Sequence, residues 1–230
     1  VAAVRNAIAS GRRVVCSLAP SFIADFHVHR VEELAQALCQ LGFSAVEETA
    51  VGAQLVSDAY ATAMREHQQS VLISSCCPTI NLLVQKYHPS MLPYMAKVLT
   101  PAQAHCTLLK QRDPDCYTVF IGPCIAKKAE ARERDVADAV DQVLTFREMQ
   151  DIFDAAGIDP KASEEDLRDH SSRAGRLYAR TGGVSEAVQS TLNRLAPGRS
   201  IPLRARQADG VMACKTLLSE IKSGELTTNF

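Results

Sequence analysis

Long apolar runs and an excess of charge of one sign are both absent from this sequence. No apolar stretch approaches the ~20 residues that a membrane-spanning helix needs, and the N-terminus carries no apolar core of a secretory signal. The 25 Lys and Arg nearly balance the 26 Asp and Glu, which leaves a net charge of -1. No general field therefore attracts nucleic acid or an anionic membrane. These absences predict a cytoplasmic protein with a small or neutral partner, with no nucleic acid and no membrane among its partners.

Internal repeats and low-complexity tracts are also absent, and 47% of the 230 residues are hydrophobic. This apolar material is sufficient for a large core, which excludes a disordered chain. Eight cysteines occur without a secretory signal. Because cytosolic thiols stay reduced, these cysteines are not expected to form a disulfide framework.

Three segments share a pattern in which β-branched and apolar residues lead into small residues and a proline. They are residues 12–21 (RRVVCSLAPS), 70–78 (SVLISSCCP) and 117–124 (YTVFIGPC). Each is typical of a buried strand in a parallel sheet. Helical patterns lie between them, and this order predicts an α/β fold with crossover connections. Because ligands bind beyond the carboxyl ends of such strands, we expect the three proline-containing corners to meet at one site.

The remaining elements follow from apolar spacing and from residues that begin or end helices. Thr100 and Pro101 are a typical N-cap and first helical residue, and Gly157 is typical of a helix end. Residues 141–146 and 201–209 are further strand candidates. Helices are predicted over residues 31–38, 51–67, 81–87, 101–110, 147–156, 184–195 and 211–223.

Cys77 and Cys124 lie in loops that also contain proline or glycine. Thiolates ligate iron–sulfur clusters, often from loops whose backbone N–H groups face the sulfur atoms. The alternative is that both are small buried hydrophobic residues, since free cysteine is among the most buried residue types. Two cysteines at equivalent strand ends, one of them doubled as Cys76–Cys77, favour the cluster interpretation.

The positions of the other five cysteines do not require a metal-binding or catalytic site. Packing accounts for Cys16 in a strand and for Cys39 and Cys106 on helices, whereas Cys116 lies in a charged turn that we expect to be exposed. Cys214 shares a helical face with apolar residues and is predicted to be core. His27 and His29 have a metal-ligand spacing but no acidic or cysteine partner, so we interpret them as exposed residues at a helix entrance.

The segments SSCCPTI (74–80), GPCIAKKAEA (122–131) and LAPS (18–21) resemble a known family. They are similar to the catalytic domain of [FeFe]-hydrogenases, whose first two cluster-binding signatures read approximately TSCCP and MPCxxKxxE. The similarity continues through residues 42–56, 181–187 and 217–225, and so covers nearly the whole chain. Adjacent cysteines before a proline, with Pro-Cys-x-x-Lys at this separation, are a specific signal.

The resemblance implies an H-cluster, which is a [4Fe–4S] cluster joined to a two-iron subsite with CO and cyanide ligands. Cys77 and Cys124 would be two of the four thiolate ligands of the [4Fe–4S] part. Cys76 would stand beside the open iron position and relay protons, because the surroundings of a thiol can adjust its pKa. Lys127 would hydrogen-bond an iron-bound cyanide, which gives it both a catalytic and a cofactor-binding role.

Further cofactor-binding residues are implied by the same similarity. Ala19, Pro20 and Ser21 would line the other face of the cofactor, and Pro123 would brace the corner of the second signature. The implied fold has two lobes, each a small mostly parallel sheet flanked by helices, with the active-site cleft between them. We expect the first lobe to span residues 1–112 and the second residues 113–230.

The implied reaction of the parent protein is the reversible interconversion of H2 with protons and electrons. Its expected partners are an electron-transfer protein, or a fused ferredoxin or signalling domain, together with dedicated maturation proteins. A hydrogen or redox sensor with little turnover is an alternative interpretation. A third interpretation is an iron–sulfur assembly protein that lacks the two-iron site. The presence of Cys76, Lys127 and the segment Ala-Pro-Ser counts against this third interpretation.

Departures from the family pattern are informative. The third signature resembles EVMACxGGC, and residues 209–215 (DGVMACK) echo it without the second cysteine. We therefore expect the chain to be a fragment that ends before the true third signature and cannot alone complete a four-cysteine cluster. Gly122 and Ala102 replace a usual Met and Gln, and the glutamates of the family's proton path have no clear match near residues 59–63. Such changes are typical of the divergent, sensory-like members.

Overall fold

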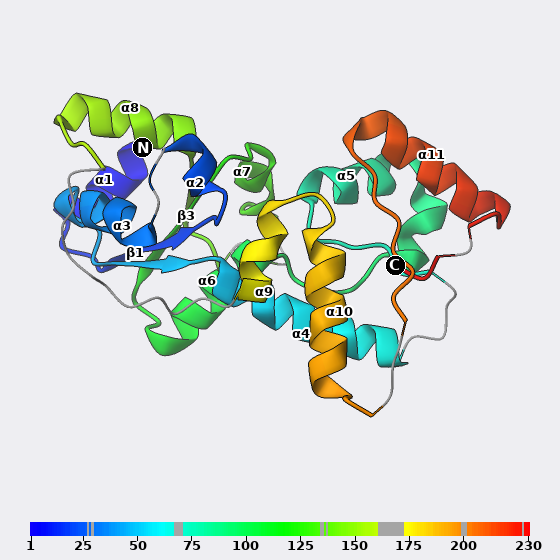
Figure 1. Ribbon diagram of the computed structural model, residues 1–230. Helices are drawn as coiled ribbons and strands as arrows, with labels where there is room; N and C mark the ends of the chain where they lie inside the picture. Colours follow the sequence, from blue (N-terminus) through cyan, green and yellow to red (C-terminus); the bar gives the residue numbers. More distant parts are fainter. Residues whose placement is uncertain are drawn as a thin grey trace.

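The computed structural model describes residues 1–26, 28, 30–66, 71–133, 136, 138–160, 173–198, 202–226 and 228–230. The chain forms a sheet lobe, which contains the N-terminus, and a helical lobe, which contains the C-terminus (Figure 1). Helix α4 (Ala50–Glu66) runs from one lobe to the other. The predicted α/β class is confirmed. His27 and His29, which the sequence places at an exposed helix entrance, lie outside the described residues.

The sheet lobe is built on four parallel strands in the order β2-β1-β3-β4. In the register of the sheet, Cys16 stands between Val46 and Val119. The β-branched character of β1 and β3 and their nearly complete burial explain why they occupy the centre. β2 was not predicted, because its sequence AVEE is short and polar for a strand. The strands are β1 (Val14–Leu18), β2 (Ala45–Glu48), β3 (Tyr117–Gly122) and β4 (Gln142–Thr145).

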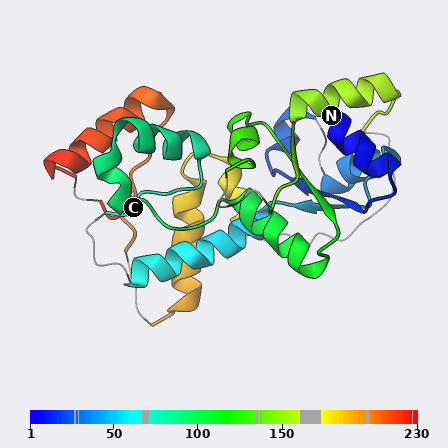
Figure 2. The same ribbon diagram turned by 180° about the vertical axis from the view of Figure 1, so that it is seen from behind.

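Helices cover both faces of the sheet. α1 (Ala2–Ala9), α3 (Val31–Gln40) and α8 (Phe146–Ala156) lie on one face, and α6 (Pro101–Arg112) lies on the other (Figures 1 and 2). Alternation along β1 serves both faces: Val14, Cys16 and Leu18 belong to the main core, whereas Val15 packs with Leu109 of α6. The short helices α2 (Phe22–Asp25) and α7 (Ala126–Glu130) stand beyond the carboxyl ends of β1 and β3.

The predicted helix ends are largely confirmed. Thr100 caps α6 by accepting a hydrogen bond from the Gln103 N–H, and Pro101 is its first residue. α8 ends at Gly157, which adopts the left-handed conformation with φ 67°. At its start, Thr145 and Glu148 form a capping box, and the Lys128 ammonium donates to Glu148 over 2.6 Å. Burial alone would raise the pKa of Glu148, but the hydrogen bonds from Lys128 and Thr145 outweigh it and lower this pKa to about 2.

We expect Glu148→Gln to destabilise the protein by about 1 kcal/mol at pH 7, because the capping box and the partner of Lys128 are both weakened. The folded pKa of Glu148 is lowered, so its contribution is present above the ordinary pKa of about 4.5 and is lost as the pH falls towards 2. Urea unfolding at pH 7 and pH 3 measures this. An equal difference between wild type and variant at both pH values would contradict the assignment.

The helical lobe has its own core, formed by Val56, Tyr60, Leu72, Val188, Leu192 and Phe230 with their neighbours. Backbone hydrogen bonds join three extended segments here: Leu72 N–H to Asn229 O over 3.2 Å, and Arg206 N–H to Phe230 O over 2.9 Å. None of the helices that the structure describes is both long and apolar enough to cross a membrane. The helical elements of this lobe, besides α4, are α5 (Pro78–Tyr87), η1 (Pro89–Tyr94), α9 (Arg173–Arg176), η2 (Leu177–Ala179), α10 (Gly183–Leu195) and α11 (Gly210–Ser223).

Two predicted strands are wrong. Residues 71–78 form only one β-bridge, between Ile73 and Met95, and residues 202–208 contain no strand. The reason at the first segment is that a side chain takes a backbone group that a strand would use, because the Ser75 N–H donates to the Tyr60 hydroxyl. Within the described residues, the helical lobe therefore has this bridge in place of the expected second sheet.

The buried positions of Cys16 and Cys106 are confirmed, whereas two other cysteine predictions are wrong. Cys116 is buried, not exposed, because it directly precedes β3 and packs with Val15. Cys39 is exposed, because it follows the buried Leu38 on the solvent side of α3.

The expected boundary near residue 112 falls at the end of α6, directly before β3. β1 and β2 precede this point and β3 and β4 follow it, yet all four strands belong to one sheet. A boundary there would divide the sheet, so the sheet lobe is discontinuous in sequence.

Candidate functional site

Two of the three proline-containing corners lie side by side at the carboxyl edge of the sheet. The Ala19 N–H donates to Ile121 O over 2.8 Å, which places the Ala19–Ser21 segment directly beside the end of β3. Gly122 permits this approach, since a Cβ there would stand 3.1 Å from that of Ala19 and 2.7 Å from the Phe120 ring. Ala19 is buried, Pro20 and Ser21 are half-buried, Pro123 is exposed and Cys124 is half-buried.

The third corner approaches from the helical lobe, and not from a strand of the same sheet. Cys77 is the N-cap of α5, and Pro78 is its first residue. α5 contacts α7, and both views show the two helices as neighbours where the lobes meet (Figures 1 and 2). Cys77 is exposed and Cys76 is half-buried. The corner with the adjacent cysteines therefore comes to this region through packing between the lobes.

Lys127 links the two corners. Its backbone N–H donates to Cys124 O over 3.3 Å, and its charge acts on the thiol of Cys76. The Lys127 ammonium donates to Glu130 over 2.8 Å, and the two side chains are only 11% and 6% exposed. An ammonium has three N–H donors, so this ion pair leaves Lys127 with donors for a further acceptor. Glu130 was missed as a site residue, although the Cys124-x-x-Lys127-x-x-Glu130 spacing could have revealed it.

The Cys76 thiol is held in its neutral form. Burial raises its pKa, and the nearby Cys77 adds to this; the hydrogen bond with Ser74 and the charge of Lys127 only partly oppose the rise. The Ser74 hydroxyl lies 3.2 Å from the Cys76 sulfur and 3.2 Å from the Tyr60 hydroxyl. Ser74 and Tyr60 are also absent from the predicted site. The sequence offers no signal for them, because Tyr60 lies on α4 and meets the corner only in the folded chain.

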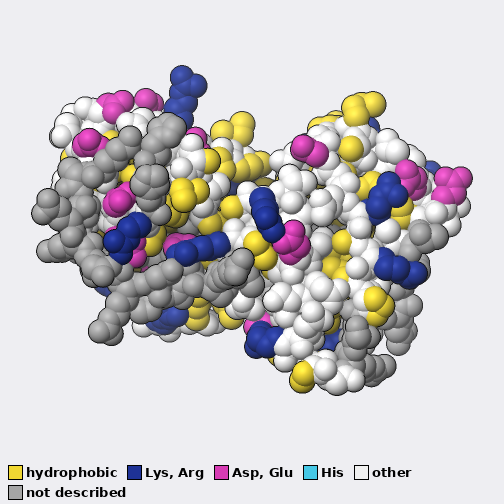
Figure 3. Space-filling view, viewed as in Figure 1, with side chains coloured by type: hydrophobic (Ala, Val, Ile, Leu, Met, Phe, Trp, Pro, Cys, Tyr) yellow, Lys and Arg dark blue, Asp and Glu magenta, His cyan; other side chains and the backbone are white. Residues whose placement is uncertain are grey.

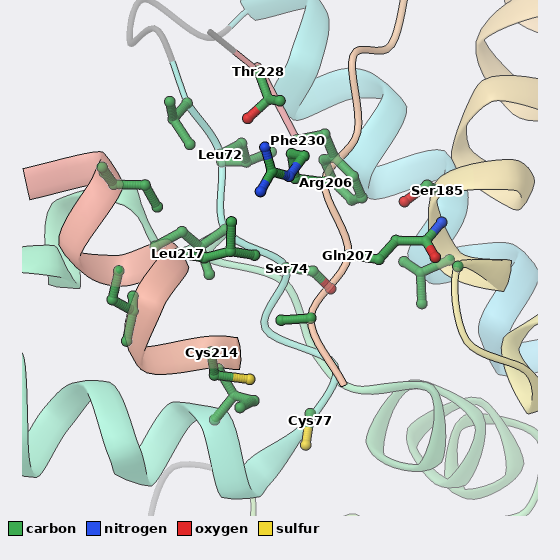
Figure 4. A pocket seen from close by; sticks show the side chains of 18 of the residues that line it. Leu72, Ser74, Cys77, Ser185, Arg206, Gln207, Cys214, Leu217, Thr228 and Phe230 are labelled. Carbon is green, nitrogen blue, oxygen red and sulfur yellow. The ribbon is translucent and has the colours of Figure 1, made fainter. Parts of the chain in front are cut away.

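A cavity of about 390 Å³ opens beside this corner within the helical lobe. Its walls are mainly apolar, with polar groups from Ser74, Arg206 and Gln207, and Cys77 and Cys214 lie at one end of it (Figure 4). The prediction that Cys214 is core is therefore wrong, because it is half-buried. Partial burial raises the pKa of its thiol, and the nearby Cys77 adds to this rise. Hydrophobic side chains remain at the surface around the junction of the lobes (Figure 3). Ile125, which lies directly before α7, and Met212 on α11 (Gly210–Ser223) are both exposed.

Comparison with known families decides what kind of domain this is. The profile of the family described as "Iron only hydrogenase large subunit, C-terminal domain" matches residues 12–230. The chain belongs to this family. It contains paired cysteines before a proline and a separate Pro-Cys-x-x-Lys segment.

Relatives of this hydrogenase-family domain include hydrogenases and proteins named NAR1. Iron hydrogenase 1 of Clostridium pasteurianum is 27% identical over 252 residues, which cover 96% of this chain and 44% of that protein. Protein NAR1 of Arabidopsis thaliana is 30% identical over 232 residues, covering 80% of this chain and 49% of that protein. A cytosolic Fe-S cluster assembly factor NAR1 of Eremothecium gossypii is 37% identical over 122 residues, covering 51% and 27%. The chain thus spans less than half the length of these relatives.

Solved structures show the same fold. The apo form of a variant of [FeFe]-hydrogenase HydA1 from Chlamydomonas reinhardtii has a TM-score of 0.74 and 20% identity, covering 99% of this chain and 80% of that one. HydA(deltaEFG), from a study of stepwise H-cluster assembly, has a TM-score of 0.75 and 19% identity, with the same coverage. The arrangement of the lobes is therefore that of the [FeFe]-hydrogenase fold.

The family implies iron–sulfur cofactors, and the thiols of this chain can be tested against them. A [4Fe–4S] cluster normally needs four thiolates. Cys77 and Cys124 occupy the two motif positions, but among the described residues no three His, Cys, Asp or Glu side chains form a group that could hold a metal ion. The described part of the chain therefore does not by itself complete a four-ligand cluster site.

Proposed function

We propose that the parent protein of this domain reversibly interconverts H2 with protons and electrons at an H-cluster. Family membership supports the proposal, as does similarity to an iron hydrogenase along 96% of the chain. The observation that carries it is that α5, whose N-cap is Cys77, packs against α7, which begins two residues after Cys124. Cys77 and Cys124 would supply two of the thiolate ligands.

The other predicted residues take supporting roles in this proposal. Ala19, Pro20, Ser21 and Pro123 shape the carboxyl edge of the sheet, where a cofactor would be covered. Lys127 offers N–H donors to an anionic ligand while Glu130 holds its side chain in place. Cys76 holds a proton on its sulfur at neutral pH. Electrons would come from a partner protein or a fused module, and maturation proteins would supply the two-iron subsite.

A second candidate is an iron–sulfur cluster assembly factor. Two relatives named NAR1 are 30% and 37% identical to this chain over their aligned regions, and this similarity favours it. Infrared bands of cyanide and carbonyl ligands in the matured parent would distinguish the two, because we expect them only with a two-iron subsite. A sensor with little turnover would show the bands but no sustained H2 production. The relatives include cytosolic proteins and a periplasmic hydrogenase, so the cytoplasmic location stays a prediction.

Iron and sulfide quantification on the anaerobically purified, full-length parent tests the ligand assignment. We expect Cys77→Ala and Cys124→Ala each to lose most of the iron of this domain, because a cluster that lacks one thiolate ligand is weakly held. Cys39→Ala is the matched control, since Cys39 is exposed on α3, outside both corners, and its removal should leave the iron content unchanged. Wild-type iron content in either corner variant would overturn the assignment of that cysteine.

A further inference from the structure

A run of hydrogen bonds leads from the Cys76 thiol into the core of the helical lobe. The Ser74 hydroxyl lies 3.2 Å from the Cys76 sulfur, and the fully buried Tyr60 hydroxyl lies 3.2 Å from the side-chain oxygens of both Ser74 and Ser75. The Ser75 N–H also donates to the Tyr60 oxygen over 2.8 Å. These groups come from α4 and from the corner that precedes α5, so only the folded chain brings them together.

The direction of every bond in this run follows from its last member. The Ser75 hydroxyl donates to the Val98 carbonyl over 3.0 Å, because a carbonyl can only accept. Each hydroxyl has one proton, so Ser75 must accept from Tyr60, and Tyr60 must in turn accept from Ser74. Ser74 is left with only lone pairs for the sulfur, and Cys76 therefore donates its S–H to Ser74. Burial raises the pKa of Tyr60 to about 12, which keeps the phenol a donor.

Ser74 also stands at the boundary between this run and the cavity. It lines the cavity of about 390 Å³ together with Cys77 (Figure 4). Because one water takes about 30 Å³ of liquid volume, this space has room for several. A serine oxygen has two lone pairs, so Ser74 can accept from Cys76 and still contact a cavity water. No carboxylate occurs in residues 59–63 of α4, the stretch that Tyr60 occupies.

We propose that Tyr60 is a positioning residue for the Cys76 thiol and that Ser74 connects this thiol to the cavity. Tyr60 fixes the Ser74 hydroxyl, and Ser74 in turn orients the S–H of Cys76. The role in turnover rests on the proposed function, but the hydrogen-bond geometry does not.

The S–H stretching band of Cys76 tests the geometry without any cofactor. It is measured by infrared spectroscopy on the full-length parent purified without its clusters, as the difference between each protein and its own Cys76→Ala derivative. A hydrogen-bonded S–H absorbs at lower frequency than a free one. We expect Ser74→Ala to move the band to higher frequency, and Tyr60→Phe to broaden and shift it in the same direction. An unchanged band in both variants would overturn the proposal.

Two features of the chain keep this test specific. Tyr60→Phe retains the edge-to-face contact of the ring with Phe230, whose centroid lies 5.5 Å away, and removes only the hydroxyl. Tyr178→Phe is the matched control, because the Tyr178 hydroxyl contacts Ser57 over 3.0 Å and has no bond to Ser74 among those described. It should leave the band in place, and a shift as large as that of Tyr60→Phe would overturn the specific role of Tyr60. Should Tyr60→Phe fail to fold, Ser74→Ala alone decides, since Ser74 is only half-buried.

The matured parent separates failure of this inference from failure of the proposed function. If it turns over H2, we expect Tyr60→Phe to lower the rate by about tenfold or more, with Tyr178→Phe within about twofold of wild type. Altered S–H bands in a parent that produces no H2 would support the geometry and contradict the proposed function. H2 turnover by the wild type, with S–H bands and rates that the variants leave unaltered, would support the proposed function and contradict the geometry.

Discussion

Cys76→Ala is expected to lower the H2 turnover of the matured parent protein by at least about 100-fold while its iron content stays unchanged. The physical reason is that the variant removes a thiol that keeps its proton at neutral pH, without touching Cys77 or Cys124. Methylene and sulfur are replaced by a methyl group, so no new group that can carry a proton is introduced. Gas chromatography of H2, with iron and sulfide measured on the same sample, gives both quantities.

The control for this prediction is Cys39→Ala, which removes an exposed thiol from α3. It corrects for general effects of losing a cysteine, and its turnover should remain that of wild type. If Cys76→Ala turned over H2 at the wild-type rate, this result would contradict the proton-relay role of the Cys76 thiol. A joint loss of turnover and iron would instead make Cys76 a determinant of cluster binding.

Gly52→Ala is expected to destabilise the protein by about 3 kcal/mol, the second large effect. Gly52 lies where α4 crosses α6, and a Cβ there would stand 2.2 Å from the Pro101 carbonyl oxygen and 2.8 Å from the His105 backbone nitrogen. These backbone atoms cannot move freely. The buried His105 side chain is held by the Ser17 hydroxyl at 2.8 Å, so α6 is tied to β1 at this point.

Urea unfolding measures this loss as a lower midpoint with an unchanged slope. Gly198→Ala is the matched control, because Gly198 has no atom within 4 Å of an added Cβ and has no positive φ. Its stability should lie within about 0.5 kcal/mol of wild type. A Gly52→Ala midpoint equal to that of Gly198→Ala would show that the two helices can separate at little cost.

Local sequence patterns predicted the parts of this protein that depend on neighbouring residues. β-branched runs located β1 and β3, and the Thr100–Pro101 pair located the start of α6. Both are short-range effects of backbone preference and capping. The same logic failed at residues 70–78, where the apolar run resembles a strand but Tyr60, a residue distant in sequence, takes the Ser75 N–H. A pattern within one segment contains no information about such a partner.

The amino-acid sequence by itself determined the family and the side chains available for chemistry. The paired cysteines before Pro78 and the spacing from Cys124 to Lys127 can be seen in the sequence alone. Only the tertiary structure decided which groups share a neighbourhood. It buried Cys116, brought Cys214 to the cavity beside Cys77, and connected Cys76 through Ser74 to Tyr60. Hydrogen bonds act over about 3 Å in space, whatever the separation along the chain, so bonds between distant residues exist only after the chain has folded.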